Sequence, residues 1–434
     1  MYYIWKKLRC AAVAAVVVLA LSLTGCTMPG KQEEAVQEEV TDKLQIGMSF
    51  DSFVIERWLR DRDLFVMTAK DLGADVNVQV ANGNAKEQAE QIRYFIRKDV
   101  DVIVVIAVDG SALSDVVEEA REKGIRVVSY DRLIMGTATD LYISFDNERV
   151  GELMGEALAA ALPDGGNIFA IYGSPTDQNV AMVQKGLHSV IDGSSLNIVY
   201  SNYCANWLAE LAFDAVEEGL ATTPRNLVGV MCGNDDLASQ AFRALAENRL
   251  AGKVALVGQD AELSACQRIV EGTQTMTVFK PVELLAKRAA EYAVALGYAK
   301  MSAEDRIAPE DVPDVARERL EEFDTLDLID AGSGAVLVRR SADEGSSDSD
   351  NRAHATAVQV REDGEAPASQ PEWQDEAGNT FSVSVMGDGT VTVQEEELVP
   401  YYALEPVAVT AENMDEVIIG SDFHTREDVY LNVD

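Results

Sequence analysis

Charged, amide and aromatic residues follow several apolar, strand-like segments of the sequence. Arg57 and Trp58 come after the first such segment, and Asp131 and Arg132 come directly after the run VVSY. In open parallel sheets, ligands bind beyond the carboxyl ends of the strands, so the recurrence predicts one binding cleft. The full set of candidate binding residues is Arg57, Trp58, Asp131, Arg132, Asp177, Asn179, Trp207, Asn234, Asp260 and Lys280.

The chemistry of this set fits a sugar. A pyranose has hydroxyls around its rim and C–H groups on its two faces. Carboxylate and amide oxygens accept hydrogen bonds from the sugar hydroxyls. Arg and Lys donate hydrogen bonds to the oxygens of those hydroxyls. The rings of Trp58 and Trp207 would cover the apolar faces from two sides. Because each buried polar group needs a partner, such a site rejects a sugar that lacks one hydroxyl.

Each of these residues also has a purely structural explanation. An Asp after a strand is usually a helix N-cap, an Arg–Asp pair is often a surface ion pair, and a Trp is usually part of a core. The same kinds of residue nevertheless recur at the same end of both expected sheets. Two sheets that face each other would bring all of them into one cleft, and this favours a binding site.

The elements that position these residues alternate between strands and helices. Strands are expected at 44–50, 76–80, 101–108 and 125–130, with helices at 56–72, 85–98 and 111–123. This alternation indicates parallel sheets covered on both faces. After residue 148 the same rhythm continues, with strands expected at 167–172, 197–200, 227–231, 253–258 and 273–278. The count favours an α/β fold of two doubly wound lobes, and a (β/α)₈ barrel is the alternative architecture.

The N-terminal segment has the pattern of an export signal. Lys6, Lys7 and Arg9 precede an almost wholly apolar run at 10–23, and Leu23-Thr24-Gly25-Cys26 fits the pattern that lipoprotein signal peptidase cuts. We expect residues 1–25 to be a cleaved signal peptide, Cys26 to carry lipid, and 26–43 to be an acidic tether. An uncleaved anchor is the alternative, and it leaves the protein on the same side of the membrane.

Charge and composition exclude several classes of function. The formal net charge is −38, which repels nucleic acid and anionic lipid. Three histidines and no closely spaced cysteines predict no metal site, and no cofactor is expected. Cys204, Cys232 and Cys266 are interpreted as buried structural thiols, with one disulfide left open for an exported protein.

The alternation ends near residue 300. Residues 301–398 are acidic and are interpreted as an irregular insertion that includes a solvated loop at 341–351. The alternating stretch at 381–393, centred on Gly387-Asp388-Gly389, predicts a β-hairpin. Strand-like sequence resumes at 399–410. The insertion is either a tolerated surface segment or a surface for a partner.

Several of these motifs carry a family resemblance. The segments ERWLRDRDLF, YDRLI, YISFDNERVGEL, GSPTDQN, GQDAEL and GTQTMTVFKP occur in this order. Together they resemble the D-xylose-binding members of the ribose/galactose-type (type I) periplasmic binding proteins of bacterial ABC transport. The resemblance covers about 44–300 and resumes at 399–425. Residues 301–398 are much longer than the corresponding part of that family.

The resemblance implies two α/β lobes joined by three crossover segments, near 146–149, near 280 and near 400–404. The N-terminal lobe would comprise 44–147 and 282–300, and the C-terminal lobe 148–281 and 404–434. The ten candidate residues match the family's pocket pattern: eight would bind hydroxyls, and Trp58 and Trp207 would sandwich the ring. D-xylose is the leading ligand, with glucose, arabinose and galactose as alternatives.

With the lipid anchor expected from the N-terminal segment, the resemblance implies a monomeric protein at the outer face of the cytoplasmic membrane that delivers its sugar to an ABC permease. A sensor that signals to a histidine kinase or chemoreceptor is the alternative. A glycosidase is not expected, because Asp131, Asp177 and Asp260 have Arg and Lys companions that would keep them ionised. From the sequence, no carboxyl is marked as one that holds a proton.

Overall fold

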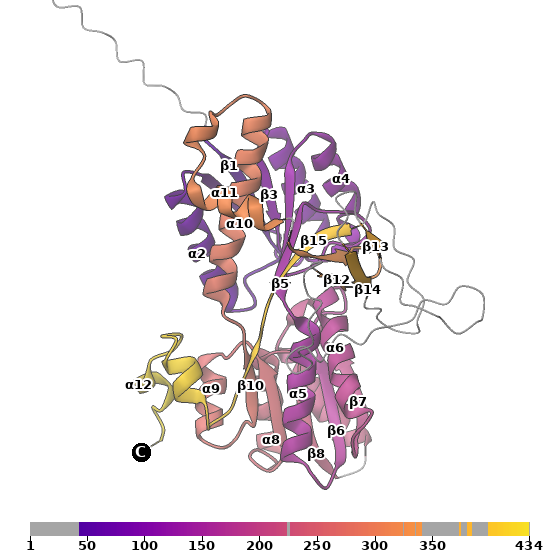
Figure 1. Cartoon of the computed structure of the whole chain (residues 1–434). Helices are drawn as coiled ribbons and strands as arrows, with labels where there is room; N and C mark the ends of the chain where they lie inside the picture. Colours follow the sequence, from indigo (N-terminus) through magenta and orange to yellow (C-terminus); the bar gives the residue numbers. More distant parts are fainter. Residues whose placement is uncertain are drawn as a thin grey trace, which may run out of the picture. The chain divides into compact units, whose positions relative to one another are not determined.

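The computed structural model describes residues 43–223, 226–323, 325–334, 336–340, 373–374, 380–383 and 398–433. The expected signal peptide, Cys26, all but the end of the tether, and the Gly387-Asp388-Gly389 turn lie outside the described residues. The solvated loop expected at 341–351 also lies outside them. The other predictions can be compared with two separate sheets and the helices that cover them (Figure 1).

The first sheet is built on six parallel strands. In spatial order they are β2 (Asp75–Val80), β1 (Gln45–Phe50), β3 (Val102–Val105), β4 (Arg126–Tyr130), β5 (Leu141–Phe145) and β15 (Leu398–Leu404). Strand β3 is buried along its whole length, which its apolar run predicts for a strand covered on both faces.

Helices cover both faces of this sheet, and the two faces are visible in the strand pattern. Val102 and Val104 belong to one apolar cluster, whereas Ile103 and Val105 belong to another, because side chains alternate across a strand. The first cluster includes residues of α2 (Arg57–Asp71) and α10 (Val282–Ala303), and the second includes residues of α3 (Ala85–Arg97) and α4 (Ser114–Glu122). We call this sheet and its helices the N-lobe.

The second sheet forms the C-lobe. Its strands lie in the order β16 (Val407–Val409), β10 (Met276–Phe279), β9 (Ala255–Gln259), β8 (Leu227–Cys232), β6 (Gly166–Tyr172) and β7 (Leu196–Tyr203), and all are parallel except β16. Its helices are α5 (Asn147–Ala161), α6 (Gln178–Ile191), α7 (Glu210–Thr222), α8 (Asp235–Glu247), α9 (Leu263–Val270) and, near the C-terminus, α12 (Arg426–Val429). Two doubly wound sheets confirm the predicted fold class and exclude the barrel.

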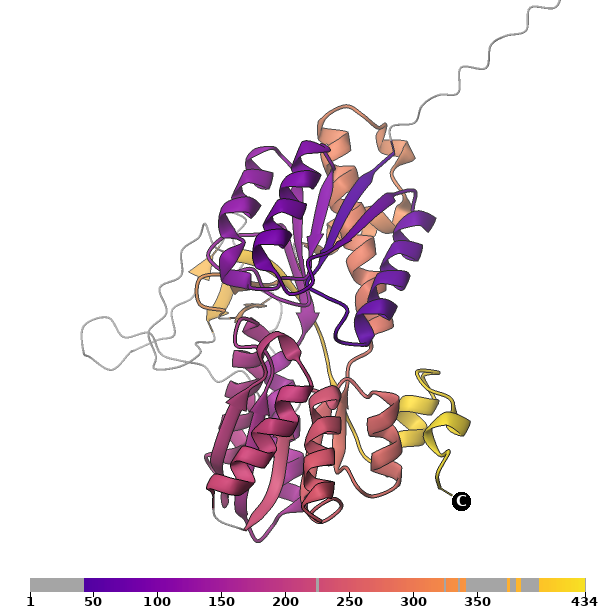
Figure 2. The ribbon, with the colours of Figure 1, turned by 180° about the vertical axis from the view of Figure 1, so that it is seen from behind.

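The chain passes between the two lobes three times. It leaves the N-lobe sheet after β5 and enters α5, which packs on α6 of the C-lobe. It returns between β10 and α10, which packs on α2, and it crosses again between β15 and β16 (Figures 1 and 2). The strand-like stretch at 399–410 is therefore two strands that belong to different sheets, and the third crossing lies between them.

The described parts of the insertion are more regular than the sequence interpretation of an irregular segment allowed. After α10 ends at Ala303, the chain forms α11 (Asp314–Phe323), which packs on α10. Strands β11 (Asp327–Asp330), β12 (Val336–Arg340), β14 (Thr380–Val383) and β13 (Trp373–Gln374) then extend the N-lobe sheet beyond β15, and all of these pairings are antiparallel. Of the expected hairpin at 381–393, only 381–383 are described, as part of β14.

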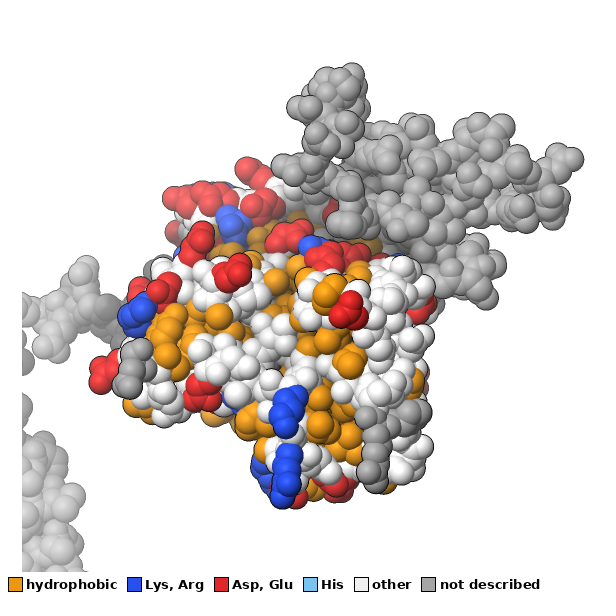
Figure 3. Space-filling model, turned by 90° about the horizontal axis from the view of Figure 1, so that it is seen from below, with side chains coloured by type: hydrophobic (Ala, Val, Ile, Leu, Met, Phe, Trp, Pro, Cys, Tyr) orange, Lys and Arg blue, Asp and Glu red, His pale blue; other side chains and the backbone are white. Residues whose placement is uncertain are grey.

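Short helical turns complete the fold: 3₁₀ turns at Gly110–Ala112, Ala205–Trp207 and Pro309–Asp311, and a π turn at Asp415–Ile419. Cys204, Cys232 and Cys266 are buried free thiols. Acidic side chains are spread over the face seen in Figure 3 rather than gathered in one patch. Within the described part of the chain, no helix has the length and apolarity needed to cross a membrane.

Candidate ligand-binding site between the lobes

A cavity between the lobes brings together nine of the ten candidate residues. Side chains from both sheets line it, together with backbone at Gly173 and Gly233. The candidate residues that line the cavity are Arg57, Trp58, Asp131, Arg132, Asp177, Asn179, Trp207, Asp260 and Lys280. Asn234 is the exception. It caps α8, where its side chain accepts a hydrogen bond from the Leu237 amide at 3.0 Å.

Arg57 is the first residue of α2 and is held by three carboxylates. Its Nη2 lies 2.8 Å from Oδ2 of Asp131 and 3.1 Å from Oδ1 of Asp61, one helical turn further on. Its Nη1 lies 4.0 Å from Oδ1 of Asp260, which belongs to the C-lobe. Because Arg57 is almost fully buried, these partners are what make burial of its charge tolerable.

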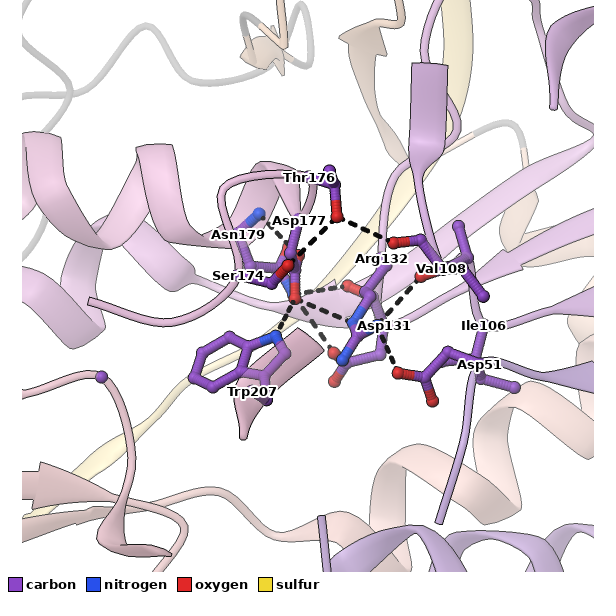
Figure 4. Close-up of polar contacts among 12 residues, drawn as sticks. Asp51, Ile106, Val108, Asp131, Arg132, Ser174, Thr176, Asp177, Asn179 and Trp207 are labelled. Atoms are coloured by element: carbon purple, nitrogen blue, oxygen red, sulfur yellow. Dashed lines mark hydrogen bonds and ion pairs between the residues drawn. The ribbon is translucent and has the colours of Figure 1, made fainter. Parts of the chain in front are cut away.

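Arg132 connects the two lobes. Its Nη1 donates to Asp51 at 2.7 Å and to the Ala107 carbonyl at 3.0 Å, both in the N-lobe. Its Nε lies 2.8 Å from Oδ2 of Asp177 in the C-lobe, close enough for an ion pair although the N–H is not aimed at that oxygen. Figure 4 shows the guanidinium group between the two carboxylates.

Asp131 and Asp260 occupy equivalent positions in the two lobes. Asp131 follows β4 with φ 62°, and its amide donates to the carbonyl of Ile143 on β5 at 2.7 Å. Asp260 follows β9 with φ 93°, and its amide donates to the carbonyl of Val278 on β10 at 2.8 Å. Both therefore turn a carboxylate into the cleft from the carboxyl end of a strand, at a left-handed backbone conformation that non-glycine residues rarely adopt.

Each of these carboxylates has a partner in the cavity. The Nζ of Lys280 lies 2.8 Å from Oδ1 of Asp260. The Nδ2 of Asn179, in the C-lobe, donates to Oδ1 of Asp131 at 3.1 Å and to its carbonyl at 3.0 Å. The cleft is thus lined by alternating acceptors and donors, which is the arrangement that a ring of hydroxyls can bind.

The two tryptophans both line the cavity. Trp58 is buried, and the guanidinium of Arg57 lies 4.4 Å from its ring centroid. The indole of Trp207 donates from Nε1 to Oδ2 of Asp177 at 3.1 Å. A Cβ at Gly173 would lie 2.2 Å from the Trp207 ring, so only glycine lets the indole lie there.

Burial and charge act in opposite directions on the carboxyl groups. Burial raises the pKa of Asp131, but the nearby Arg57, Lys280 and Arg132 outweigh it, and the pKa lies below its ordinary value. For Asp177 burial prevails, and its pKa lies above the ordinary value although Arg132 lowers it. Two carboxyl groups behind the cavity are shifted further by burial: the pKa of Asp235 rises to about 7 and that of Glu262 to about 10.

Comparison with known proteins agrees with this geometry. Residues 46–300 match the family model described as periplasmic binding protein domain. The chain belongs to this family. It is 45% identical over 258 residues to the D-xylose-binding periplasmic protein of Haemophilus influenzae, which covers 58% of this chain and 77% of the relative. It is likewise 45% identical over 259 residues to the D-xylose-binding periplasmic protein of Escherichia coli, covering 59% and 78%.

A solved structure extends the likeness of fold. An ABC transporter solute-binding protein from Clostridium phytofermentans, solved with β-D-glucose, superposes with a TM-score of 0.60 at 22% identity. The match covers 89% of this chain and 99% of that protein, so it runs well beyond the part shared with the two curated relatives. The two curated relatives and the solved structure are named as binding proteins and not as enzymes. This agrees with the expectation from the sequence that the chain is not a glycosidase.

Sequence reasoning missed several residues of the cavity wall. Asn147, Tyr172, Met231 and Gln259 also line it, as do Ile55, Val180 and Val183. Asn147 stands in the motif YISFDNERVGEL and Gln259 directly precedes Asp260, so the positions after strand ends could have indicated both. The apolar lining residues carry no such signal, because they cannot be told from core residues in a sequence. The raised pKa values of Asp235 and Glu262 could not be read from the sequence either, because their cause is burial in the tertiary structure.

Proposed function

We propose that this periplasmic binding protein captures a monosaccharide, D-xylose in the first place, between its two lobes and delivers it to an ABC importer. Support comes from two relatives that are named as D-xylose-binding and from the candidate residues that line one interlobe cavity. In this proposal Arg57, Asp131, Arg132, Asp177, Asn179, Asp260 and Lys280 bind hydroxyls, and Trp58 and Trp207 cover the ring faces. Asn234 would join them only if its amide turned toward the sugar.

The observation that carries the proposal is a group of buried polar atoms without hydrogen-bond partners. Three cavity residues contribute atoms that have neither a hydrogen bond nor an ion pair among the described residues: Trp58 through Nε1, Arg132 through Nη2 and Gln259 through Oε1. Leaving a buried donor or acceptor unpaired costs about 1–3 kcal/mol, so a cluster of them favours a polar ligand. Donors and acceptors occur side by side, which suits hydroxyl groups because a hydroxyl can both donate and accept.

Lobe movement is the proposed mechanism. The cavity has about 30 Å³ of free space, room for little more than one or two water molecules, so a sugar ring cannot enter unless the lobes move apart. Arg132–Asp177 and Asn179–Asp131 both join one lobe to the other. We propose that opening breaks these contacts, and that the sugar restores the closed form by binding across it.

D-xylose heads the ranking of sugars, and glucose, arabinose and galactose follow. A hexose differs from xylose by a hydroxymethyl group, which needs only a little additional room. A dissociation constant in the micromolar range, which corresponds to a binding free energy of about −8 kcal/mol, would suit a carrier that must also release its sugar.

Membrane attachment is part of the same proposal. Cys26, after Leu23-Thr24-Gly25, is the proposed site of lipid attachment at the outer face of the cytoplasmic membrane. Mass spectrometry of the N-terminal peptide tests this. A peptide that begins at Cys26 with a mass increase of attached acyl chains supports the anchor, and an unmodified Cys26 contradicts it.

A sensor role uses the same sugar site, and the two roles differ in the partner. A purified ABC permease whose ATPase activity rises with the sugar-loaded protein supports transport. Stimulation of a histidine kinase instead would favour the sensor.

The sugar itself is tested by competition. The full-length protein is titrated with D-xylose, and then with D-glucose, L-arabinose, D-galactose and D-ribose in the presence of D-xylose. We expect D-xylose to bind most tightly and D-ribose to compete poorly. Failure of all five sugars to bind would refute the proposal.

A further inference from the structure

Part of the insertion belongs to an apolar cluster that touches both lobes. Ile329 lies within β11, and Ala331 directly follows that strand. Both share this cluster with Leu133, from the loop that follows β4, and with Met182, from α6 of the C-lobe. We call it the bridging cluster. All of its members are largely buried, and the remaining ones are Ala138, Tyr142, Val399 and Tyr401.

The insertion presents its two residues from a tight turn. The carboxylate of Asp330 accepts hydrogen bonds from the Gly332 amide and the Ser333 hydroxyl, both at 2.8 Å. The amide of Gly334 donates to the carbonyl of Asp330 at 2.6 Å. Asp330 itself is only 1% exposed. Because Asp330 is buried and hydrogen-bonded within this turn, it fixes the positions of its two neighbours, Ile329 and Ala331.

The turn holds the loop that carries Asp131 and Arg132. The amide of Gly136 donates to the carbonyl of Ala331 at 3.0 Å, and Leu133 belongs to the bridging cluster. On its other side the loop is held by the N-lobe, where Ile134 joins the cluster beneath α3 and α4. The loop is thus clamped between the N-lobe and the insertion, directly after two residues of the cavity wall.

The bridging cluster also reaches the opposite wall of the cavity. Met182 lies three residues after Asn179 on α6, a helix whose N-cap is Asp177. Tyr142 stacks on Tyr401 with ring centroids 4.9 Å apart. The hydroxyl of Tyr142 lies 3.1 Å from both the carbonyl of Asp131 and Oδ1 of Asn179. One cluster thus supports polar residues from both lobes.

We propose that Ile329 of the insertion is a positioning residue, which through the bridging cluster holds Asp131 and Arg132 against Asp177 and Asn179 and so favours the closed, sugar-binding form. The effect on sugar affinity rests on the proposed function, whereas the effect on the loop does not. A segment that contacts both walls can bias the lobes only if its contacts differ between open and closed forms. Met182 and Leu133 lie on opposite lobes, so opening separates them.

Substitution of Ile329 tests this inference. Ile329→Ala removes apolar contacts from the bridging cluster without touching the cavity. We expect hydrogen–deuterium exchange of the full-length protein without sugar to become faster in 131–138 and in 178–183. We also expect the affinity for D-xylose to fall by about fivefold or more, mainly through faster dissociation, because the closed form is less populated. Ile329→Val, which keeps most of the contact, should restore both.

Leu328→Ala is the matched control. Leu328 is the preceding residue of β11, is half-buried, points to the other face of the sheet and does not belong to the bridging cluster. Faster exchange in Ile329→Ala but not in Leu328→Ala supports the positioning role. Equal exchange at 131–138 and 178–183 in the two variants overturns it, whether or not any sugar binds. Absence of sugar binding to the unmodified protein would instead refute the proposed function, and the exchange comparison would still decide the positioning role.

Discussion

The Nε of Arg132 in the N-lobe lies 2.8 Å from Oδ2 of Asp177 in the C-lobe, across the cavity that the two lobes enclose. Nη1 of the same guanidinium is held by Asp51 within the N-lobe, and its Nη2 has no hydrogen-bond partner. One side chain therefore joins the lobes and still keeps a donor for a ligand. Arginine can do both because its five N–H donors form a rigid, planar fork.

Arg132→Lys keeps the charge but removes the fork. Since a single ammonium cannot reach Asp51, Asp177 and a sugar hydroxyl together, we expect the affinity for sugar to fall at least about tenfold, or about 1.4 kcal/mol, in calorimetry. Arg268→Lys is the control. Arg268 is buried like Arg132, at 8% exposure against 3%, but it does not line the cavity. Equal affinities of the two variants would contradict the role of Arg132.

Thr176→Val tests lobe closure without changing the cavity wall. The hydroxyl of Thr176, in the C-lobe, donates to the carbonyl of Val108, in the N-lobe, at 3.0 Å (Figure 4). Loss of this hydrogen bond should cost the closed form about 0.5–1.5 kcal/mol, so sugar should dissociate about two- to tenfold faster in stopped-flow fluorescence. An unchanged dissociation rate would show that the closed form does not depend on this hydrogen bond.

Gly173→Ala should disturb the Trp207 platform. The added Cβ would lie 2.2 Å from the indole ring, which must then move. We expect a loss of about 1–3 kcal/mol in the free energy of unfolding, together with weaker sugar binding. Gly193→Ala is the control, because the nearest atom to a Cβ there is 3.9 Å away. A Gly173→Ala protein as stable as Gly193→Ala would contradict the packing described for Trp207.

Asp235 should make stability depend on pH. Burial raises its pKa to about 7, against about 4 in an unfolded chain, although hydrogen bonds from Thr277 and Gln274 lower it. The native protein therefore binds more protons than the unfolded chain between pH 4 and 7. Its contribution to stability is full below pH 4 and is lost as the pH rises through 7.

Asp235→Asn cannot titrate and should remove this dependence. In urea unfolding, we expect the free energy of unfolding of the unmodified protein minus that of the variant to be larger at pH 4.5 than at pH 7.5, by about 3 kcal/mol. The comparison of the two proteins cancels the titration of carboxyl groups that do not interact with Asp235, whereas the pKa of Glu262, which Asp235 raises, changes with the substitution. A difference that is the same at both pH values would refute the raised pKa.

Much of the fold could be predicted from the sequence because parallel sheets have a strong local signature. The run at 101–108 and the alternation at 76–80 correspond to β3 and β2. Strands β11 and β12 of the insertion were not predicted, because their order comes from partners distant in sequence. β11 pairs with β15 about 70 residues later in the chain, and the turn at Asp330 is held by its own side chain.

Most of the candidate site could also be predicted from the sequence, because its residues follow the strands. Asp131, Asp177 and Asp260 each follow a strand, and the carboxyl ends of the strands of both sheets face one cavity. Asn234 also follows a strand, yet its side chain caps α8 and does not line the cavity. Strand ends thus indicate which residues are near a cleft, whereas the orientation of each side chain depends on local hydrogen bonds that a sequence does not reveal.

Calorimetric titration of the full-length protein with D-xylose, repeated with Trp207→Ala, tests the central claim most directly. Trp207 lines the cavity, donates to Asp177 and is proposed to cover one face of the ring. We expect micromolar binding of one D-xylose per chain, which is abolished or weakened at least about a hundredfold in Trp207→Ala. Absence of binding to the unmodified protein, or equal binding to both proteins, would contradict capture of a sugar in this cavity.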